Sequence, residues 1–315
     1  MFGFVVRRLF GMLLVMFIVG IIVFIITRAV PGDPIAIMLG EQATPEDIER
    51  MRGIYGLDQP LPVQFVLWLK QLASGNLGTS IFFSAPVSQL LIARAEPTAL
   101  LSAVALTFAV TLGLPAGLIS AARPGGLLDR ALLGVAMIAA GVPSFWLGLV
   151  LMQYLAVKAG WFPVAGYGPP EATSLQRLPY LVLPGLALAL PNAALLARMT
   201  RSSMLEVASL DYVRTAMAKG LAPRTVFLKH AFRNALITVI TVIGVIAAVL
   251  LSGVVVVETV FSLPGLGQLV MSAVLRRDYP VIQGALIIVA GIYVLVNLIV
   301  DILYGLIDPR VSYAS

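Results

Sequence analysis

Side chains that could carry out catalysis are scarce in this sequence of 315 residues. It contains one histidine, His230, and no cysteine, which excludes a thiolate zinc site, a cysteine nucleophile and a disulfide framework. A zinc protease of the H-E-x-x-H type needs two histidines on one helix face, and a serine–histidine protease needs its histidine beside a serine. The sequence also lacks a G-x-x-x-x-G-K-[S/T] phosphate loop. We therefore expect no enzyme, no catalytic residue and no bound cofactor or metal in this chain.

Three polar residues near apolar stretches could contact a solute or form a gate. Glu258 follows one such stretch, and Asn297 and Asp301 lie one helical turn apart near the end of the last one. A carrier driven by protons or sodium ions usually keeps ionisable groups near the middle of the membrane, and no such group lies there. This pattern counts against a stand-alone secondary carrier or channel subunit, which stays open as the alternative function.

The elements that must position these residues follow from the composition. The chain is 60% hydrophobic and 11% charged, whereas a soluble domain is about 45–50% apolar and about 25% charged. Six uncharged stretches approach or exceed the roughly 20 residues that a helix needs to cross the hydrocarbon core. They are residues 9–26, 97–122, 131–157, 178–197, 235–257 and 281–300. Because the alternation of barrel strands is absent, the sequence predicts an all-α membrane protein with six transmembrane helices.

The distribution of basic residues predicts the orientation of these helices. With the N-terminus inside, the inner segments hold 12 of the 21 Lys and Arg residues, and seven of those lie in one loop, residues 198–234. Both termini are then cytoplasmic, and residues 31–96 form a sizeable outer segment. In that segment Thr44 and Asp47 resemble a capping box, with Pro45 at the first helical position. Topology accounts for the net charge of +6, so we expect a lipid bilayer and no nucleic acid as a partner.

The inner loop contains a short predicted helix at residues 212–219. Asp211 is the expected N-cap, and Gly220 falls where a left-handed residue belongs after the helix, with Pro223 shortly beyond it. The apolar residues of the helix share one face and are Val213, Ala216, Met217 and Leu221. Such a helix can dock in a groove of another protein or lie on the lipid surface. The residues alone leave both possibilities open.

This loop resembles the EAA loop of ABC-transporter permeases, in which the letters E-A-A and three further residues precede a glycine. Here Arg214-Thr215-Ala216 occupies the E-A-A position, and Gly220 is the glycine. The first two letters depart from the general pattern but match the R-T-A-x-A-K-G-L form associated with the peptide-type subgroup. The closing I-x-L-P of the pattern is replaced by His230-Ala231-Phe232-Arg233-Asn234-Ala235-Leu236, which is also similar to that subgroup.

Further motifs extend the resemblance over nearly the whole chain. They are PGDP at 31–34, YGLDQPL at 55–61, GNLGTS at 75–80, PSFWLG at 143–148, ETVFSLPGLG at 258–267, DYPVIQG at 278–284 and DILYGLIDPR at 301–310. In this order they are similar to the first of the two permease subunits of dipeptide/oligopeptide/nickel-type ABC importers.

The resemblance implies a multi-pass subunit of the bacterial inner membrane that forms half of a translocation pathway for peptides or a similar small solute. Its implied partners are a second permease subunit, two ATP-binding cassette subunits that hold ATP and magnesium, and a periplasmic or lipid-anchored substrate-binding protein. Nickel complexes, glutathione-like thiols and oligosaccharides stay open as substrates beside dipeptides and oligopeptides. The ATPase-coupling residues implied are Tyr212, Val213, Arg214, Thr215, Ala216, Met217, Lys219, Gly220 and Leu221.

The same resemblance implies a division of the chain into three parts. Residues 1–30 would form the cytoplasmic N-terminus and the first helix, and residues 31–96 the outer segment. Residues 97–315 would form a five-helix permease core that contains the coupling loop 198–234.

Overall fold

The computed structural model describes residues 2–29, 35, 39, 43–54 and 56–307. Of residues 2–9, 29, 54, 251–253 and 300–307 it describes the backbone alone. The PGDP motif at 31–34, Tyr55 and residues 308–315 therefore lie outside the described residues, as does the side chain of Asp301. Within the described part the chain is helical, with one isolated β-bridge between Thr79 and Pro86.

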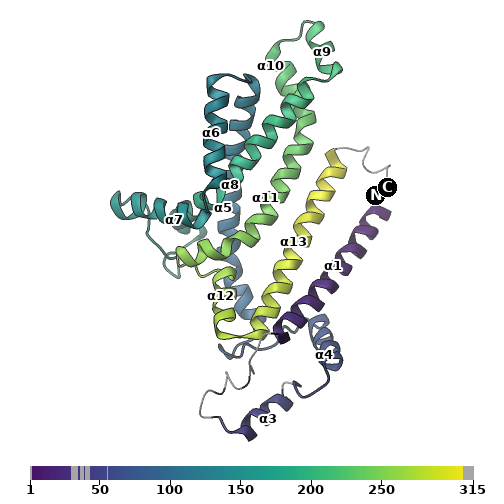
Figure 1. Cartoon of the computed structure of the whole chain (residues 1–315), viewed down its shortest axis with the longest axis vertical. Helices are drawn as coiled ribbons and strands as arrows, with labels where there is room; N and C mark the ends of the chain where they lie inside the picture. Colours follow the sequence, from purple (N-terminus) through teal and green to yellow (C-terminus); the bar gives the residue numbers. More distant parts are fainter. Residues whose placement is uncertain (1, 30–34, 36–38, 40–42, 55, 308–315) are drawn as a thin grey trace. The chain divides into compact units, whose positions relative to one another are not determined.

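Five described helices are long and apolar enough to cross a membrane, and a bent helix pair brings the number to six if it is one span. The five are α1 (Phe2–Ala29), α5 (Val87–Ala122), α8 (Ser174–Ala208), α11 (Phe232–Val260) and α13 (Tyr279–Ile307) (Figure 1). Each overlaps one of the uncharged stretches of the sequence. The prediction of an all-α membrane protein is confirmed.

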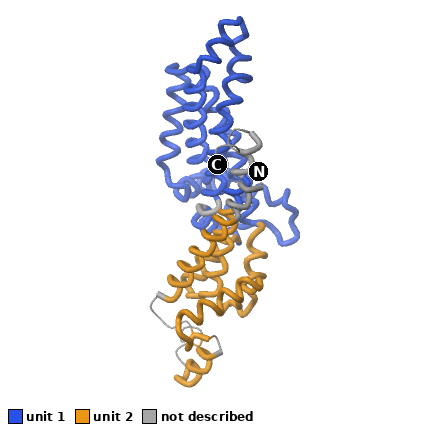
Figure 2. Tube along the Cα trace, turned by 90° about the vertical axis from the view of Figure 1, so that its right-hand side faces the viewer, with its two compact units in different colours: residues 1, 97–264, 295–315 blue, residues 2–96, 265–294 orange. Residues whose placement is uncertain are grey.

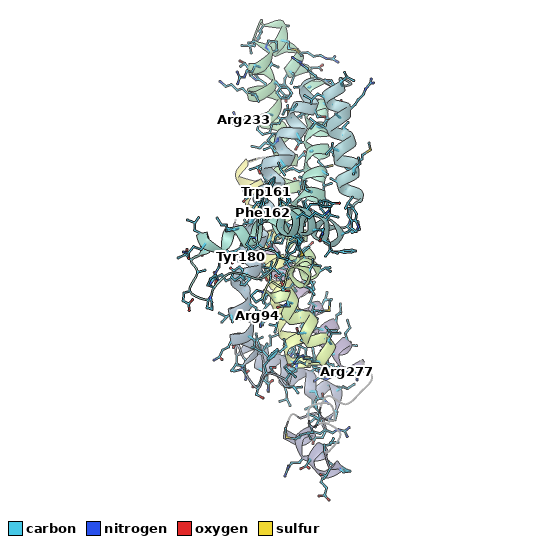
Figure 3. The ribbon with its side chains drawn as sticks, turned by 90° about the vertical axis from the view of Figure 1, so that its left-hand side faces the viewer. Arg94, Trp161, Phe162, Tyr180, Arg233 and Arg277 are labelled. Carbon is cyan, nitrogen blue, oxygen red and sulfur yellow. The ribbon has the colours of Figure 1, made fainter. Side chains whose placement is uncertain are left out.

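The third predicted span, residues 131–157, is not one straight helix. It is divided into α6 (Leu127–Gly141), followed by α7 (Ser144–Leu151) and the π-helical η1 (Met152–Lys158), and the two parts are bent by 103°. The break falls at Val142 and Pro143, where both residues have extended backbone. Proline has no backbone N–H and disfavours a helical residue before it, so the chain turns there. Trp161 and Phe162 lie in the segment that follows η1 (Figure 3).

The chain forms two compact units, which Figure 2 shows in different colours. Unit 1 comprises residues 97–264 and 295–307 of the described chain, and here α5, α7, η1, α8 and α11 contribute to a core that includes Leu101, Leu181, Leu196 and Ile246. Helix α6 packs on α8. Close packing of α5 on α8 depends on small residues. A methyl group at Gly113 would lie 2.6 Å from the carbonyl oxygen of Ala193, and one at Gly117 would lie equally close to that of Ala197.

Unit 2 comprises residues 2–96 and 265–294. It contains α1, α3 (Pro45–Ile54), α4 (Leu61–Ala73), α12 (Leu266–Arg276) and the first turns of α5 and α13. Asp278, just before α13, is buried and accepts hydrogen bonds from the Ser80 hydroxyl and from the backbone N–H groups of Ile81 and Phe82. Gln283 donates to the Thr27 hydroxyl at 2.7 Å and so joins α13 to α1.

The predicted start of α3 is confirmed in part. The backbone N–H of Asp47 donates to the Thr44 hydroxyl oxygen at 3.2 Å, and the helix begins at Pro45. The Thr44 hydroxyl donates in turn to the Asp47 carboxylate at 2.6 Å. This bond, helped by Arg50, lowers the pKa of Asp47 below its ordinary value. The short charged helix α3 is therefore suited to water.

Candidate functional site

The short helix expected in the inner loop is present as α9 (Asp211–Ala218), but its N-cap is not Asp211. Leu210 occupies the cap position with extended backbone, and no side chain caps the helix. Asp211 is the first helical residue, where its negative charge still favours the positive end of the helix dipole. The sequence could not separate the two positions because aspartate is favoured at both.

The predicted end of this helix is confirmed at Gly220, which has a φ of +79°. The N–H of Gly220 donates to the carbonyl of Met217 at 2.9 Å, and the N–H of Leu221 donates to the carbonyl of Ala216 at 3.4 Å. These two bonds form a Schellman motif, in which glycine takes the left-handed position without a steric penalty. The end of α9 is thus fixed by backbone geometry.

The apolar face of α9 is divided between the interior of the loop and its surface. Val213 and Ala216 are buried against Val226 of η2 (Val226–Ala231) and against Val207 at the end of α8. Met217 and Leu221 are 51% and 40% exposed, and Tyr212 is 41% exposed. The expected single docking face is therefore smaller than the sequence indicated. Its buried half, Val213 and Ala216, holds the loop together. Its exposed half consists of Met217 and Leu221, which we call the α9 surface.

Polar contacts attach α9 to the neighbouring helices. The Asn234 amide on α11 donates to the Tyr212 hydroxyl oxygen at 2.7 Å. The Thr215 hydroxyl donates to the carbonyl of Asp211 at 2.9 Å within the helix. Arg214, Lys219, Arg224, Lys229 and Arg233 are exposed around the loop, and Figure 3 shows Arg233 near the start of α11. The loop thus presents a small apolar patch surrounded by positive charge.

A partly buried ion pair that the sequence did not reveal lies at the same end of unit 1. Arg201 of α8 donates from Nε and Nη2 to the two carboxylate oxygens of Asp129 on α6, at 2.7 and 2.8 Å. The Ser120 hydroxyl of α5 and the backbone N–H of Gly125 donate to the same carboxylate. Asp129 and Arg201 are 72 residues apart, so no local spacing could have indicated the contact.

The three predicted pathway or gate residues lie on two helices, Glu258 on α11 and both Asn297 and Asp301 on α13. Glu258 lies near the end of α11, is completely buried, and accepts a hydrogen bond of 2.5 Å from the Thr98 hydroxyl on α5. Asn297 is half-buried on α13. The side chain of Asp301 lies outside the description. In this conformation the Glu258 carboxylate therefore contacts protein, and its role as a gate stays a prediction.

A large cavity of about 1030 Å³ lies within unit 2. Its walls include Arg28 of α1, Gln64 and Trp68 of α4, and Gln283 of α13. Among the described residues no group of three or more His, Cys, Asp or Glu side chains could hold a metal ion.

Family comparisons match the chain from end to end. Residues 113–313 match the model of the binding-protein-dependent transport system inner membrane component, and residues 1–114 match the model of its N-terminal part. A probable peptide ABC transporter permease of Sinorhizobium fredii is 44% identical over 310 residues, which cover 98% of this chain and 99% of the relative. The oligopeptide transport system permease AppB of Bacillus subtilis is 40% identical over 316 residues, 99% of this chain and 100% of the relative.

A solved structure shares the fold. The inward-facing methionine ABC transporter MetNI contains a chain that superimposes with a TM-score of 0.59 at 19% identity. The match covers 70% of this chain and 97% of that chain.

Proposed function

Because the chain belongs to the family of binding-protein-dependent transport system inner membrane components, we propose that it forms half of the translocation pathway of a peptide importer. It is a transmembrane permease subunit of an ATP-driven ABC importer, a transport component without catalytic activity of its own. A stand-alone carrier or channel is thereby set aside. The finer parts of the proposal concern the coupling loop, the topology, the partners and the substrate.

The coupling loop is the proposed contact with the ATPase subunits, and the architecture of α9 is the observation that carries this part. The helix is held in place by the packing of Val213 and Ala216 against Val226, and it ends in the Schellman motif at Gly220. Met217 and Leu221 are exposed and do not belong to the buried cluster that holds the loop together. An apolar patch on a short rigid helix is suited to a groove of a partner protein.

Motion of the ATPases would pass from α9 into the membrane through two attachments. One is the packing of Val213 and Ala216 near Val207, at the end of α8. The other is the hydrogen bond from Asn234 to Tyr212, which ties α9 to α11. Since α8 and α11 are long continuous helices, displacement of α9 would tilt both of them. We infer rigid-body tilting of this kind as the basis of alternating access.

The proposed orientation places α9 and both termini in the cytoplasm. In residues 97–264, the end of unit 1 that carries α9 holds nine basic residues: Arg123, Arg130, Arg198, Arg201, Arg214, Lys219, Arg224, Lys229 and Arg233. The opposite end holds Lys158 and Arg177. This asymmetry supports a cytoplasmic position for the loop by the positive-inside rule. Residues 31–96 then lie on the outer side of a bacterial inner membrane.

The proposed partners are a second permease subunit, two ATP-binding cassette subunits and an outer substrate-binding protein. ATP and magnesium would bind to the cassette subunits, because this sequence has no phosphate loop. The proposed substrates are peptides, since relatives that match the whole chain are named for peptide and oligopeptide transport. Screening the ligands of the substrate-binding protein encoded beside this gene would identify the solute. A nickel complex or an oligosaccharide as the bound ligand would overturn the peptide proposal.

Crosslinking tests the proposed coupling contact directly, because the natural chain has no cysteine. Met217→Cys, treated with a short bifunctional maleimide reagent in membranes that contain the whole transporter, should link to an ATPase subunit carrying a surface cysteine beside its groove. Leu127→Cys is the matched control, because Leu127 is also exposed at this end of unit 1 but lies on α6. Equal crosslinking from both positions, or none from Met217→Cys, would contradict the proposal.

A further inference from the structure

Helix α4 packs against the middle and the end of the first membrane-spanning helix. The ring of Phe65 lies 5.1 Å from that of Phe24 and 6.3 Å from that of Phe17, centroid to centroid. The ring of Trp68 lies 5.8 Å from that of Phe24, and a methyl group at Gly20 would be 3.6 Å from the Trp68 ring. Figure 1 shows α4 beside the corresponding part of α1. Both helices belong to unit 2.

These contacts lie at a depth that lipid hydrocarbon occupies. The apolar span of α1 is Phe10–Arg28, with a mean hydropathy of 3.0. At about 1.5 Å per residue, Phe24 lies about 6 Å and Phe17 about 16 Å along the axis from Arg28. Half of a hydrocarbon core is about 15 Å thick. Phe65 contacts both phenylalanines, so α4 meets α1 between the Arg28 end of the span and about the middle of the hydrocarbon core.

The exposed side chains of α4 between Leu61 and Leu67 are apolar, and the exposed Lys70 and Gln71 follow in its last turn. Val63 and Val66 are 43% and 49% exposed. The exposed residues of α1 at the same depth are Phe17, Ile18, Ile22 and Ile25, so the exposed apolar surface continues from one helix to the other. By contrast, the exposed side chains of the neighbouring helix α3 include Glu46, Glu49 and Arg50. The two helices of the outer segment are therefore suited to different solvents.

A polar anchor holds the beginning of α4 at the end of the span. Gln64 is buried and accepts a hydrogen bond of 2.9 Å from Nε of Arg28. Its amide donates to the carbonyl oxygens of Leu57 and Gln59, at 3.2 and 2.8 Å. The buried Gln64 amide is thus satisfied by protein. Lys70, in the last turn of α4, is exposed, and its long side chain can extend its ammonium group to the headgroups.

We propose that α4 is an interfacial helix whose Val63–Val66 side is covered by lipid acyl chains in the half of the membrane adjoining Arg28. The outer segment is then partly a membrane-bound element. Continuity with the exposed apolar side of the membrane-spanning helix α1 favours lipid as the cover. An interfacial helix of this type buries its apolar side about 5–10 Å into the boundary between headgroups and acyl chains.

Depth-dependent quenching of a fluorescent probe tests this inference on the assembled transporter in lipid nanodiscs. A probe on Val66→Cys should be quenched by lipids that carry a spin label on the acyl chain and should be at least about twofold less sensitive to aqueous iodide than a probe on Glu49→Cys. Glu49 lies in α3 and is exposed, so its probe should respond to iodide and not to the labelled lipids.

Two results would overturn the inference. Quenching of the Val66 probe by iodide alone would place α4 in water. Protection of this probe from both quenchers would show that a protein subunit covers the helix. Neither result depends on whether α9 binds an ATPase, so failure of this inference is distinguishable from failure of the proposed coupling contact.

Discussion

Arg201 and Asp129 join α8 to α6 through two parallel hydrogen bonds of 2.7 and 2.8 Å. The same carboxylate accepts a hydrogen bond from Ser120 of α5, so one buried acid connects three helices at the end of unit 1 that carries α9. A displacement of α8 that begins at α9 would therefore carry α5 and α6 with it. We infer that the pair would link these three helices mechanically during transport.

We predict that Asp129→Ala lowers the unfolding midpoint of the detergent-solubilised transporter by several degrees, because it leaves the Arg201 guanidinium without its carboxylate partner. Arg201→Lys should lower it less, since lysine keeps the charge but cannot form the two-pronged contact. Fluorescence-detected size-exclusion chromatography after heating measures the midpoint. Arg130→Ala, at an exposed neighbouring residue on α6, is the control and should unfold like the natural protein. A natural midpoint for Asp129→Ala would contradict the proposed link.

We predict that Gly220→Val inserts normally into the membrane but abolishes substrate uptake. The left-handed φ of +79° is unfavourable for a β-branched residue by about 1–3 kcal/mol. No neighbouring heavy atom lies within 4 Å of the added Cβ position, so the cost comes from the backbone and not from a clash. Gly220→Asn is the matched control, because asparagine tolerates this conformation, and it should retain most uptake. Uptake assays at equal membrane levels of each variant decide the question.

The divided apolar face of α9 predicts two different phenotypes for neighbouring substitutions. Met217→Asp should weaken ATPase association at least about tenfold in a pull-down while the permease remains as stable as the natural protein, since Met217 is exposed. Ala216→Asp should reduce both association and stability, because it places a charge against Val213 and Val226. Lys219→Gln should be mild in both measurements. If Met217→Asp binds the ATPase normally, α9 is a helix of the lipid surface and the coupling proposal fails.

The sequence predicted those features that depend on local composition. Hydropathy located α1, α5, α8, α11 and α13, because a long apolar run is a sufficient cause of a membrane helix. The short helix before Gly220 was predicted because glycine and proline at its end act through the adjacent backbone. These signals need no knowledge of distant residues.

The features that the sequence did not reveal depend on contacts between residues that are far apart in the chain. Hydropathy gives the length of the third span but not its bend at Val142 and Pro143, which the proline alone indicates. The burial of Ala216 depends on Val207 of α8 and Val226 of η2, which lie outside α9 in the sequence but pack against it. The pairing of Asp129 with Arg201 likewise requires α6 and α8 to be adjacent. No periodicity within one helix contains that information.

We predict that Gln59→Cys reacts with a membrane-impermeant maleimide in intact spheroplasts. Gln59 is exposed, and its contact with Gln64 uses only its backbone carbonyl, so the substitution should leave α4 in place. Reaction before lysis places residues 31–96 outside, as the basic residues of the loops indicate. Leu221→Cys, in the coupling loop, is the control and should react only after lysis. The reverse order of labelling would invert the proposed topology.

Glu258 provides the last prediction, because its burial and its hydrogen bond from Thr98 separate a structural role from a gating role. Glu258→Gln keeps an acceptor oxygen of the same reach, and we expect it to retain both stability and uptake. Glu258→Leu removes the acceptor of the buried Thr98 hydroxyl and should destabilise the subunit by about 1–3 kcal/mol.

Adding Thr98→Val to Glu258→Leu should then cost little more, because the two side chains share one interaction. Unfolding midpoints of the single and double variants give this coupling, and uptake measured on the same membranes gives the functional effect. Loss of uptake by Glu258→Gln at an unchanged midpoint would contradict the structural role. It would instead show that the ionised carboxylate acts in the pathway, which requires α5 and α11 to separate at Thr98 during transport.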